Sequence, residues 1–284
     1  MAQGHAGAVA FLFRPVVWCE TLDERRFRTA AVHYAARPPY PDALIEGVAG
    51  FCAFTRAHRL LDLGTGPGVL AIAFAPYVGS VLAADPEPEM LLLAREAARA
   101  AGVAVEVREG SSETLDAGWG RFRAATLGRS FHWMDRAQTL ERLDGIVEPE
   151  GAVILFNDEL ADAPENAAMR AWWAVIHRYS EDDPVRAKRR SPEWQDHETL
   201  LRASAFSRID RIVYPHQYSV TVERLIHRAL SMSSTSASRL GPRTQEMIDE
   251  IQAALSPFAA TGEMIEAMEW TAIVARRPVP ERRG

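Results

Sequence analysis

The 284-residue sequence lacks the features that mark several common classes of protein. It has two cysteines, Cys19 and Cys52, with no C-x-x-C pair and no cysteine and histidine cluster at zinc-ligand spacing. We therefore expect neither a disulfide framework nor a bound metal. The apolar run from Ala8 to Phe13 has no preceding Lys or Arg and is too short to cross a membrane, so the sequence predicts a cytoplasmic protein with no membrane partner.

An excess of positive charge is also lacking. Lys and Arg number 32 against 38 Asp and Glu, which gives a net charge of -6 and a pI near 5.8. Because nucleic-acid binding depends mainly on basic side chains that neutralise phosphates, no nucleic-acid partner is expected. The basic run Arg186–Arg190 follows three acidic residues, 181–183, and is interpreted as a solvated loop or helix end, with a nucleic-acid patch as the alternative.

The chain does contain a conspicuous glycine-rich turn. Leu60–Leu63 has the apolar character of a buried parallel strand, and three glycines follow it within five residues, at Gly64, Gly66 and Gly68. The helix that begins near Gly68 directs free backbone N–H groups toward the turn, which favours an anionic ligand. Asp85 ends a second apolar run about twenty residues later, where a carboxylate can accept hydrogen bonds from ribose hydroxyls. The sequence therefore predicts a nucleoside pocket.

The spacing of the glycines narrows the choice of nucleoside. A dinucleotide-binding fingerprint is G-x-G-x-x-G, whereas Val69 occupies the position three after Gly66 and the spacing here is G-x-G-x-G. An NAD-dependent oxidoreductase is therefore the less favoured alternative. A glycine-rich turn without a ligand is the structural alternative.

Strands and helices alternate through the first half of the chain. The expected strands are Leu60–Leu63, Val81–Ala84, Val103–Val107, Phe122–Leu127, Ala152–Phe156, Ile209–Tyr214 and Glu269–Arg276. The expected helices are Asp42–Phe54 with Asp42 as N-cap, one from Gly68, Glu87–Ala101, Met134–Ile146, Glu165–Tyr179, His197–Ala203, Val222–Ser231 and Arg243–Leu255. No element is predicted in the charged segment Ser180–Glu193.

This order predicts a Rossmann-like, doubly wound α/β sheet of seven strands, mostly parallel with an antiparallel last strand. Residues 1–29 are interpreted as an N-terminal extension, and residues 30–284 as one domain. Long insertions at about 159–205 and 219–260 are expected to build a helical cap.

The glycine turn, with Asp62 two residues before Gly64, resembles motif I of the class I S-adenosylmethionine-dependent methyltransferases. Tyr34, Arg37, Pro38, Tyr40 and Pro41 fit the Tyr-x-x-Arg-Pro-x-Tyr-Pro signature of small-molecule members, of the trans-aconitate and ubiquinone-biosynthesis type, and Ser130–Asp135 fits their segment after the fourth strand. The resemblance covers about residues 30–157. It implies S-adenosylmethionine as cofactor and S-adenosylhomocysteine as product.

The resemblance also implies which residues surround the cofactor. Asp85 would accept from the ribose, Pro86 and Met90 would line the adenine, and the acceptor of the adenine amine stays open among Ser111, Ser112 and Glu113. For Arg37 the alternative is a helix-entry salt bridge, and for Tyr34 it is core packing. The full implied set is Tyr34, Arg37, Asp62, Gly64, Thr65, Gly66, Gly68, Asp85, Pro86, Met90, Ser111, Ser112, Glu113, Arg129 and Ser130.

His132 is the candidate general base, because it follows the carboxyl end of the fourth strand and an imidazole titrates near neutral pH. Its alternative role is to orient a loop. Trp133, Trp172 and Trp173 are candidates to contact the acceptor, with core packing as the alternative for the adjacent pair, whose side chains point about 100° apart on a helix.

The predicted function is methyl transfer to a small-molecule acceptor, of the kind found in secondary metabolism. The alternatives are an RNA or protein methyltransferase, a non-catalytic S-adenosylmethionine-binding protein and the NAD-dependent oxidoreductase. The acceptor, the O, N or C atom that is methylated and the oligomeric state do not follow from the sequence.

Overall fold

The computed structural model describes residues 31–260 and 264–279, so the N-terminal extension, including Cys19, lies outside the described residues. Seven strands form one sheet in the order β3-β2-β1-β4-β5-β7-β6. Strand β7 is antiparallel to both of its neighbours and the other pairs are parallel, which confirms the predicted fold class. The strands are β1 Arg59–Leu63, β2 Ser80–Asp85, β3 Glu106–Glu109, β4 Phe122–Gly128, β5 Val147–Leu160, β6 Arg208–Val220 and β7 Met264–Arg276.

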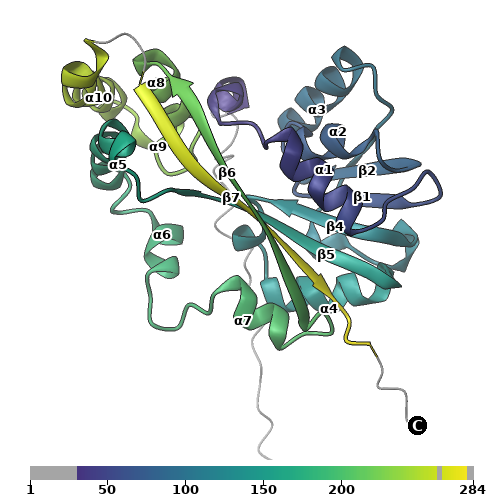
Figure 1. The fold of residues 1–284 in the computed structure, drawn as a ribbon. Coiled ribbons are helices and arrows are strands. Elements are labelled where there is room, and N and C mark those ends of the chain that lie inside the picture. The colour runs from purple at the N-terminus through teal and green to yellow at the C-terminus, as the bar shows by residue number, and fades with distance from the viewer. Residues whose placement is uncertain (1–30, 261–263, 280–284) are drawn as a thin grey trace, which may run out of the picture.

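Helices cover both faces of the sheet and one end of it (Figure 1). The α-helices are α1 Asp42–Phe51, α2 Val69–Phe74, α3 Pro88–Ala100, α4 Arg136–Ile146, α5 Ala167–Tyr179, α6 Pro184–Arg189, α7 His197–Arg202, α8 Val222–Leu230, α9 Ala237–Leu240 and α10 Arg243–Ala259. The 3-10 turns are η2 Ala31–Ala36, η3 Ser112–Thr114, η4 Ala117–Trp119, η5 Phe131–Trp133 and η6 Pro164–Asn166.

Alternation along the strands divides the core into two layers. Leu60 packs with α1 and α2 on one face, whereas Leu61 and Leu63 pack with α4 on the other. Because successive side chains of a strand point to opposite faces, a continuous apolar strand such as β1 is buried on both sides. The result is a rigid sheet whose strand ends present polar residues at one edge.

A third cluster forms a helical cap where β6 and β7 extend past the rest of the sheet (Figure 1). Its apolar side chains come mainly from α5, α8 and α10, and Trp172 lies fully buried among them. The cap also buries an ion pair, in which Arg228 of α8 lies 2.6 Å from Glu266 of β7. The two long strands therefore connect the cap rigidly to the sheet.

The third strand was predicted at Val103–Val107, which is wrong at its start. Gly102 adopts a positive φ of 67°, and the amides of Gly102 and Val103 donate back to the carbonyls of the last turn of α3. This helix-ending motif consumes the first residues of the predicted strand, so β3 begins at Glu106.

The cap of the first helix was also predicted wrongly. Asp42 is the first residue of α1 and makes no capping hydrogen bond; the helix is preceded by Pro41, whose carbonyl accepts from Leu44 and Ile45. A proline with fixed φ prepares the chain for the helix without a side-chain cap. The helix ends at Phe51, three residues before the predicted end.

Strands β5, β6 and β7 are at least five residues longer than predicted, and two helices, α6 and α9, were missed. Residues 148–151, just before the predicted fifth strand, form an irregularity inside β5, where the register with β4 shifts. Strand β6 continues through Pro215 because it is the edge strand of the sheet, where a missing N–H costs no ladder bond. Helix α6 lies in the segment predicted to lack structure and begins at Asp183, which accepts from the amides of Val185 and Arg186.

Within the described residues 31–260 and 264–279, no helix has the length and apolarity to cross a membrane.

The buried ion pair in the cap predicts a stability cost for breaking it. The Glu266→Ala substitution leaves the Arg228 guanidinium buried without its carboxylate, which we expect to lower the free energy of unfolding by about 3 to 5 kcal/mol. Urea unfolding followed by circular dichroism measures the change. Glu223→Ala removes an exposed carboxylate from α8 and is the control, expected to change stability by less than about 0.5 kcal/mol. A Glu266→Ala loss as small as the control's would contradict the prediction.

Candidate functional site

The glycine-rich turn is held by Asp62, which is 1 % exposed. Its carboxylate accepts hydrogen bonds from Thr65 Oγ1 at 2.5 Å, from Thr126 Oγ1 at 2.9 Å and from the amide of Ala71 at 3.2 Å. Burial raises the pKa of Asp62 to about 6 even though all three donors favour the charged form. Asp62 and Thr65, predicted to contact the cofactor, thus contact each other and tie the turn to β4 and α2.

Glycine is needed at each of the three positions for a different structural reason. Gly64 has a φ of +70°, and a Cβ there would lie 2.5 Å from the Cβ of Ser130. Gly66 has a φ of +55° and its nearest neighbour would be the ring of Tyr34 at 3.8 Å. A Cβ at Gly68 would meet Ala94 of α3 at 3.2 Å. Gly64 and Gly68 therefore allow close packing, and Gly66 leaves backbone open to a ligand under Tyr34.

Asp85 is the last residue of β2 and faces the same turn. Its Oδ2 accepts from the amide of Gly66 at 2.8 Å, and its Oδ1 accepts from the amide of Glu87 at 3.0 Å. Burial raises its pKa, while these two amides oppose the rise. Since a carboxylate has about four acceptor positions, Asp85 retains capacity for hydroxyl donors.

The residues that follow Asp85 lie at the carboxyl end of β2, beside the glycine turn. Pro86 is exposed beside it and Met90 is buried on α3. Gly110, just past β3, donates its amide to the carbonyl of Asp85 at 3.1 Å, which brings the Ser111–Glu113 turn to the carboxyl end of β2. Ser111 caps that turn by accepting from the amide of Glu113, and Arg142 of α4 donates to the Glu113 carbonyl.

Residues 33–41, which precede α1, form a strap over the glycine turn. Tyr34 of η2 lies over Gly66, and the Arg37 guanidinium lies 4.5 Å from the centre of the Tyr34 ring. Arg37 donates to the Oγ of Ser231 at 3.0 Å and to its carbonyl at 2.7 Å. His33 adds a second link to the cap, with its Nδ1 2.8 Å from that of His227.

Arg37 does not form the helix-entry salt bridge that the sequence offered as its alternative role. Among the described residues no carboxylate lies within 4 Å of its guanidinium, and burial lowers its pKa. A partly buried cation with only neutral partners retains attraction for an anionic ligand. Arg37 is therefore placed to receive a carboxylate.

Arg129 and Ser130 follow β4 and lie against β1. The Oγ of Ser130 donates to the carbonyl of Leu63 at 2.9 Å. Arg129, which has a φ of +57°, directs its side chain away from the turn, donating to Asp158 at 2.7 Å and to the carbonyl of Pro38 at 3.1 Å. The Asp158 carboxylate overcomes burial and raises the pKa of Arg129. The Arg129 side chain thus anchors the strap, and only its backbone can face a ligand at the turn.

His132 lies on η5 in positively charged surroundings. Burial, followed by the charges of Arg189, His197 and Arg37, lowers its pKa to about 3. His197 has a similar environment, where burial and Arg136 lower its pKa to about 4. Both imidazoles are therefore neutral at physiological pH. His132 is available to accept a proton, but as a weak base.

The three tryptophans predicted to contact an acceptor have different locations. Trp172 is fully buried in the cap and donates its indole N–H to the carbonyl of Leu225 at 3.2 Å, so it has no surface for an acceptor. Its alternative role, core packing, is what the structure shows. Trp133 is 37 % exposed beside His132, with ring centres 5.1 Å apart. Trp173 is only partly buried.

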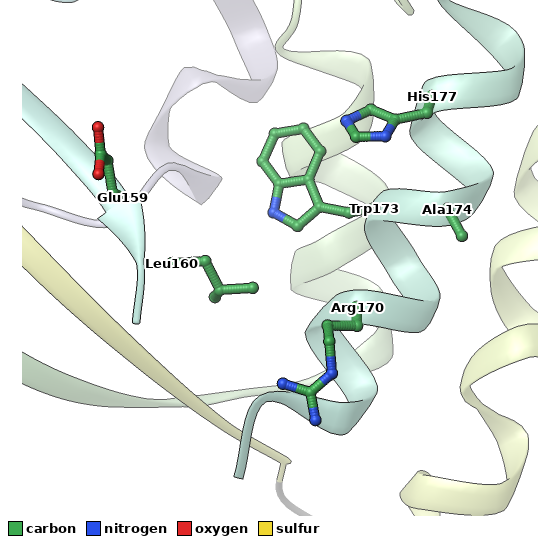
Figure 2. A pocket seen from close by; sticks show the side chains of 6 residues that line it. All are labelled: Glu159, Leu160, Arg170, Trp173, Ala174 and His177. Atoms are coloured by element: carbon green, nitrogen blue, oxygen red, sulfur yellow. The ribbon is translucent and has the colours of Figure 1, made fainter. Parts of the chain in front are cut away.

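Trp173 lines a pocket of about 520 Å³ between the end of β5 and α5. Figure 2 shows its indole extending from the helix toward the strand that carries Glu159 and Leu160, with His177 one turn farther along the same helix. Arg170 and Ala174 complete the lining. The sequence analysis did not identify this pocket.

Other partners of the site were missed because they come from distant segments. Ser231 is 194 residues from Arg37, and Asp158 is 29 residues from Arg129. The one sequence signal was the run of small hydroxyl residues in the Ser231–Ser238 segment, where most side chains are buried rather than solvated as in an ordinary polar loop. Within residues 31–260 and 264–279, no group of three His, Cys, Asp or Glu side chains is arranged to hold a metal.

Comparison with known proteins finds a similarity in the part of the sheet that carries the glycine turn. Residues 60–151 match the family model described as a methyltransferase domain. The uncharacterized methyltransferase YcgJ of Bacillus subtilis is 28 % identical over 171 residues, which cover 59 % of this chain and 65 % of the relative. The ubiquinone biosynthesis O-methyltransferase of Azorhizobium caulinodans is 33 % identical over 98 residues, covering 34 % and 39 % of the two chains.

Solved structures show the same fold. The structure of a methyltransferase from Geobacter sulfurreducens in complex with S-adenosylhomocysteine aligns with a TM-score of 0.51 at 16 % identity, covering 89 % of this chain and 98 % of the other. In contrast, this chain spans less than two thirds of the length of its curated relatives, 65 % and 39 %. The family match covers residues 60–151, which include the glycine turn and Asp85 and lie before the cap helices α5, α8 and α10.

The two low histidine pKa values predict an acid-sensitive fold. Between the folded pKa values of about 3 for His132 and about 4 for His197 and the 6.5 of an unfolded histidine, the unfolded state binds more protons. The free energy of unfolding should therefore fall as pH drops below about 6.5, because protonation favours the unfolded chain.

The double variant His132→Gln, His197→Gln removes this dependence. Between pH 7 and pH 5 we expect it to lose less stability than the unmodified protein, by about 2 to 4 kcal/mol, because each of the two imidazoles contributes up to about 2 kcal/mol over this range. Urea unfolding at the two pH values measures the difference. Equal losses in both proteins would show that these histidines are as easily protonated in the fold as in the unfolded chain.

Proposed function

We propose that the chain is a class I S-adenosylmethionine-dependent methyltransferase that methylates a small-molecule acceptor held beneath its cap. The observation that carries the proposal is the turn in which the Asp85 carboxylate and the open backbone of Gly66 lie together under Tyr34. The ubiquinone biosynthesis O-methyltransferase among the relatives supports a small organic acceptor by its name. Secondary metabolism is the context we propose for it.

The polar and charged groups at the turn fit the proposed cofactor. Asp85 has acceptor capacity left for the two ribose hydroxyls, and Gly66 leaves a side-chain-free surface against which a nucleoside can lie. Arg37 is a cation without a carboxylate partner, which suits the carboxylate of a methionine moiety. Pro86 and Met90, with the Ser111–Glu113 turn, would border the adenine.

S-adenosylmethionine supplies a sulfonium-bound methyl group whose leaving group is a neutral thioether. The protein therefore needs no acid at the departing sulfur, and its main task is to align the acceptor. Tyr34 and Arg37 close over the turn and exclude water, while Arg129 holds the strap through the Pro38 carbonyl. His132 is the residue we propose to accept a proton from the acceptor, a role that its low pKa weakens.

The other candidate functions have less support. The G-x-G-x-G spacing and the family match both separate this turn from a dinucleotide-binding fingerprint. RNA or protein methylation would need an open surface for a large acceptor, whereas the strap and the cap close over the turn through Arg37 and Ser231. A small acceptor fits this covered geometry better.

Calorimetric titration with S-adenosylhomocysteine tests the cofactor directly. We expect the protein to bind it and not NAD, and we expect Asp85→Ala to weaken binding at least about tenfold, because hydrogen bonds to a carboxylate contribute about 1.5 to 3 kcal/mol. Asp249→Ala, an exposed substitution on α10, is the control. Binding of NAD, or full affinity in Asp85→Ala, would overturn the proposed pocket.

The role of His132 can be separated from cofactor binding. We expect His132→Ala to bind S-adenosylhomocysteine normally and to lower kcat by about a hundredfold, the low end of the range for loss of a general base, because its pKa is far from neutral. Turnover on an acceptor found by screening, measured against pH, provides the readout. Unchanged turnover would remove the base from this position.

A further inference from the structure

We infer that the pocket between β5 and α5 binds a planar aromatic acceptor that carries an anionic group, with its ring against Trp173 and its anion toward Arg186. This inference rests on the proposed function, since it names the substrate class of the same site. It is carried by the pocket lining, by the position of α6 and by the charges that surround the pocket.

The pocket lies next to the strap that closes the glycine turn. Glu159 and Leu160 follow Asp158 on β5, and Asp158 is bonded to Arg129, which directly follows β4. Because the carboxyl ends of β1, β4 and β5 lie at one edge of the sheet, the pocket at the end of β5 lies on the same edge as the glycine turn. Its volume of about 520 Å³ is in the range of small-molecule sites.

The lining offers an aromatic surface. The Trp173 ring packs against Trp172 in an edge-to-face arrangement, with ring centres 4.8 Å apart at an angle of 70°, and the His177 ring centre is 5.6 Å away. The Trp173 indole extends toward Leu160 on the opposite wall (Figure 2). An indole held by a buried neighbour and facing an aliphatic side chain is a good partner for a flat ring.

Two cations lie at the pocket: Arg170 of α5 lines it and donates to the Ala163 carbonyl at 2.9 Å, and Arg186 of α6 lies beside the lining. The Arg186 guanidinium lies over the Trp173 ring, 5.9 Å from its centre. Asp183 is the nearby carboxylate that acts on Arg186, but it caps α6 and lies 3.5 Å from Arg239. Among the described residues no carboxylate comes within 4 Å of Arg186, so this cation is available to a ligand.

The charged groups that act on His132 are positive, as Arg186 is. Arg189, Arg37 and Arg136 all act on its imidazole. Glu159 is the one carboxylate in the pocket lining and stands on the opposite wall, exposed, at the end of β5. An acceptor with an anion at the α6 end therefore gains attraction there and keeps that anion away from Glu159.

Calorimetry with three probes tests the inference without turnover, each with and without saturating S-adenosylhomocysteine. The probes are 2-naphthoate, its neutral analogue 2-naphthamide, and cyclohexanecarboxylate, which has the anion but no flat ring. We expect 2-naphthoate to bind about tenfold more tightly than either analogue, since a charge-assisted contact and an aromatic contact each contribute about that factor.

Variants assign the two contributions. Arg186→Gln should remove the preference for 2-naphthoate over 2-naphthamide, and Arg202→Gln, which removes an exposed arginine from α7, should keep it. Trp173→Leu should weaken both naphthyl probes about tenfold, while Trp173→Phe should restore most of the loss. Thermal melting of each variant checks that the cap is folded. If Trp173→Leu does not fold, Trp173→Phe still tests the aromatic contact.

The outcomes separate this inference from the proposed function. Equal affinity for 2-naphthoate and 2-naphthamide, a preference that survives Arg186→Gln, or no binding of 2-naphthoate to a protein that binds S-adenosylhomocysteine would each overturn the aromatic-anion pocket. Binding of 2-naphthoate with the expected variant pattern, but none of S-adenosylhomocysteine, would support the pocket and overturn the cofactor.

Discussion

The buried carboxylate of Asp62 is the point on which the site depends. It connects three parts of the molecule, because its donors come from the glycine turn at Thr65, from α2 at Ala71 and from β4 at Thr126. A buried carboxylate is costly unless it is hydrogen-bonded, and here three donors compensate for the lost hydration. The turn is therefore rigid before any ligand arrives, and its open backbone at Gly66 is held in place.

The cap and the sheet are joined across this turn by cations. Arg129 links the strap to β5 through Asp158, and Arg37 links the strap to the cap through Ser231. These side chains differ in their partners: Arg129 has a carboxylate and Arg37 has only a hydroxyl and a carbonyl. The first contact is structural, whereas the second leaves a positive charge that a ligand can neutralise.

The family match and the inferred acceptor pocket occupy different parts of the molecule. The family match ends at residue 151, before α5 and the end of β5, which line the pocket, and before α6. The proposed cofactor contacts lie on the sheet near the glycine turn, whereas Trp173 and Arg186, which we infer to contact the acceptor, lie on α5 and α6 beyond that match. Loops and insertions on a rigid scaffold are where specificity changes most easily.

The sequence by itself determined the glycine turn, Asp85 and the alternating strands, because these follow from local spacing and periodicity. Only the tertiary structure decided that Trp172 is core while Trp173 faces a pocket, since a helix turns adjacent side chains apart without saying which one meets the cap. It also decided that Arg37 meets Ser231, a contact 194 residues apart that no local pattern encodes. The low pKa of His132 has the same origin, since it depends on burial and on arginines brought together from separate elements by packing.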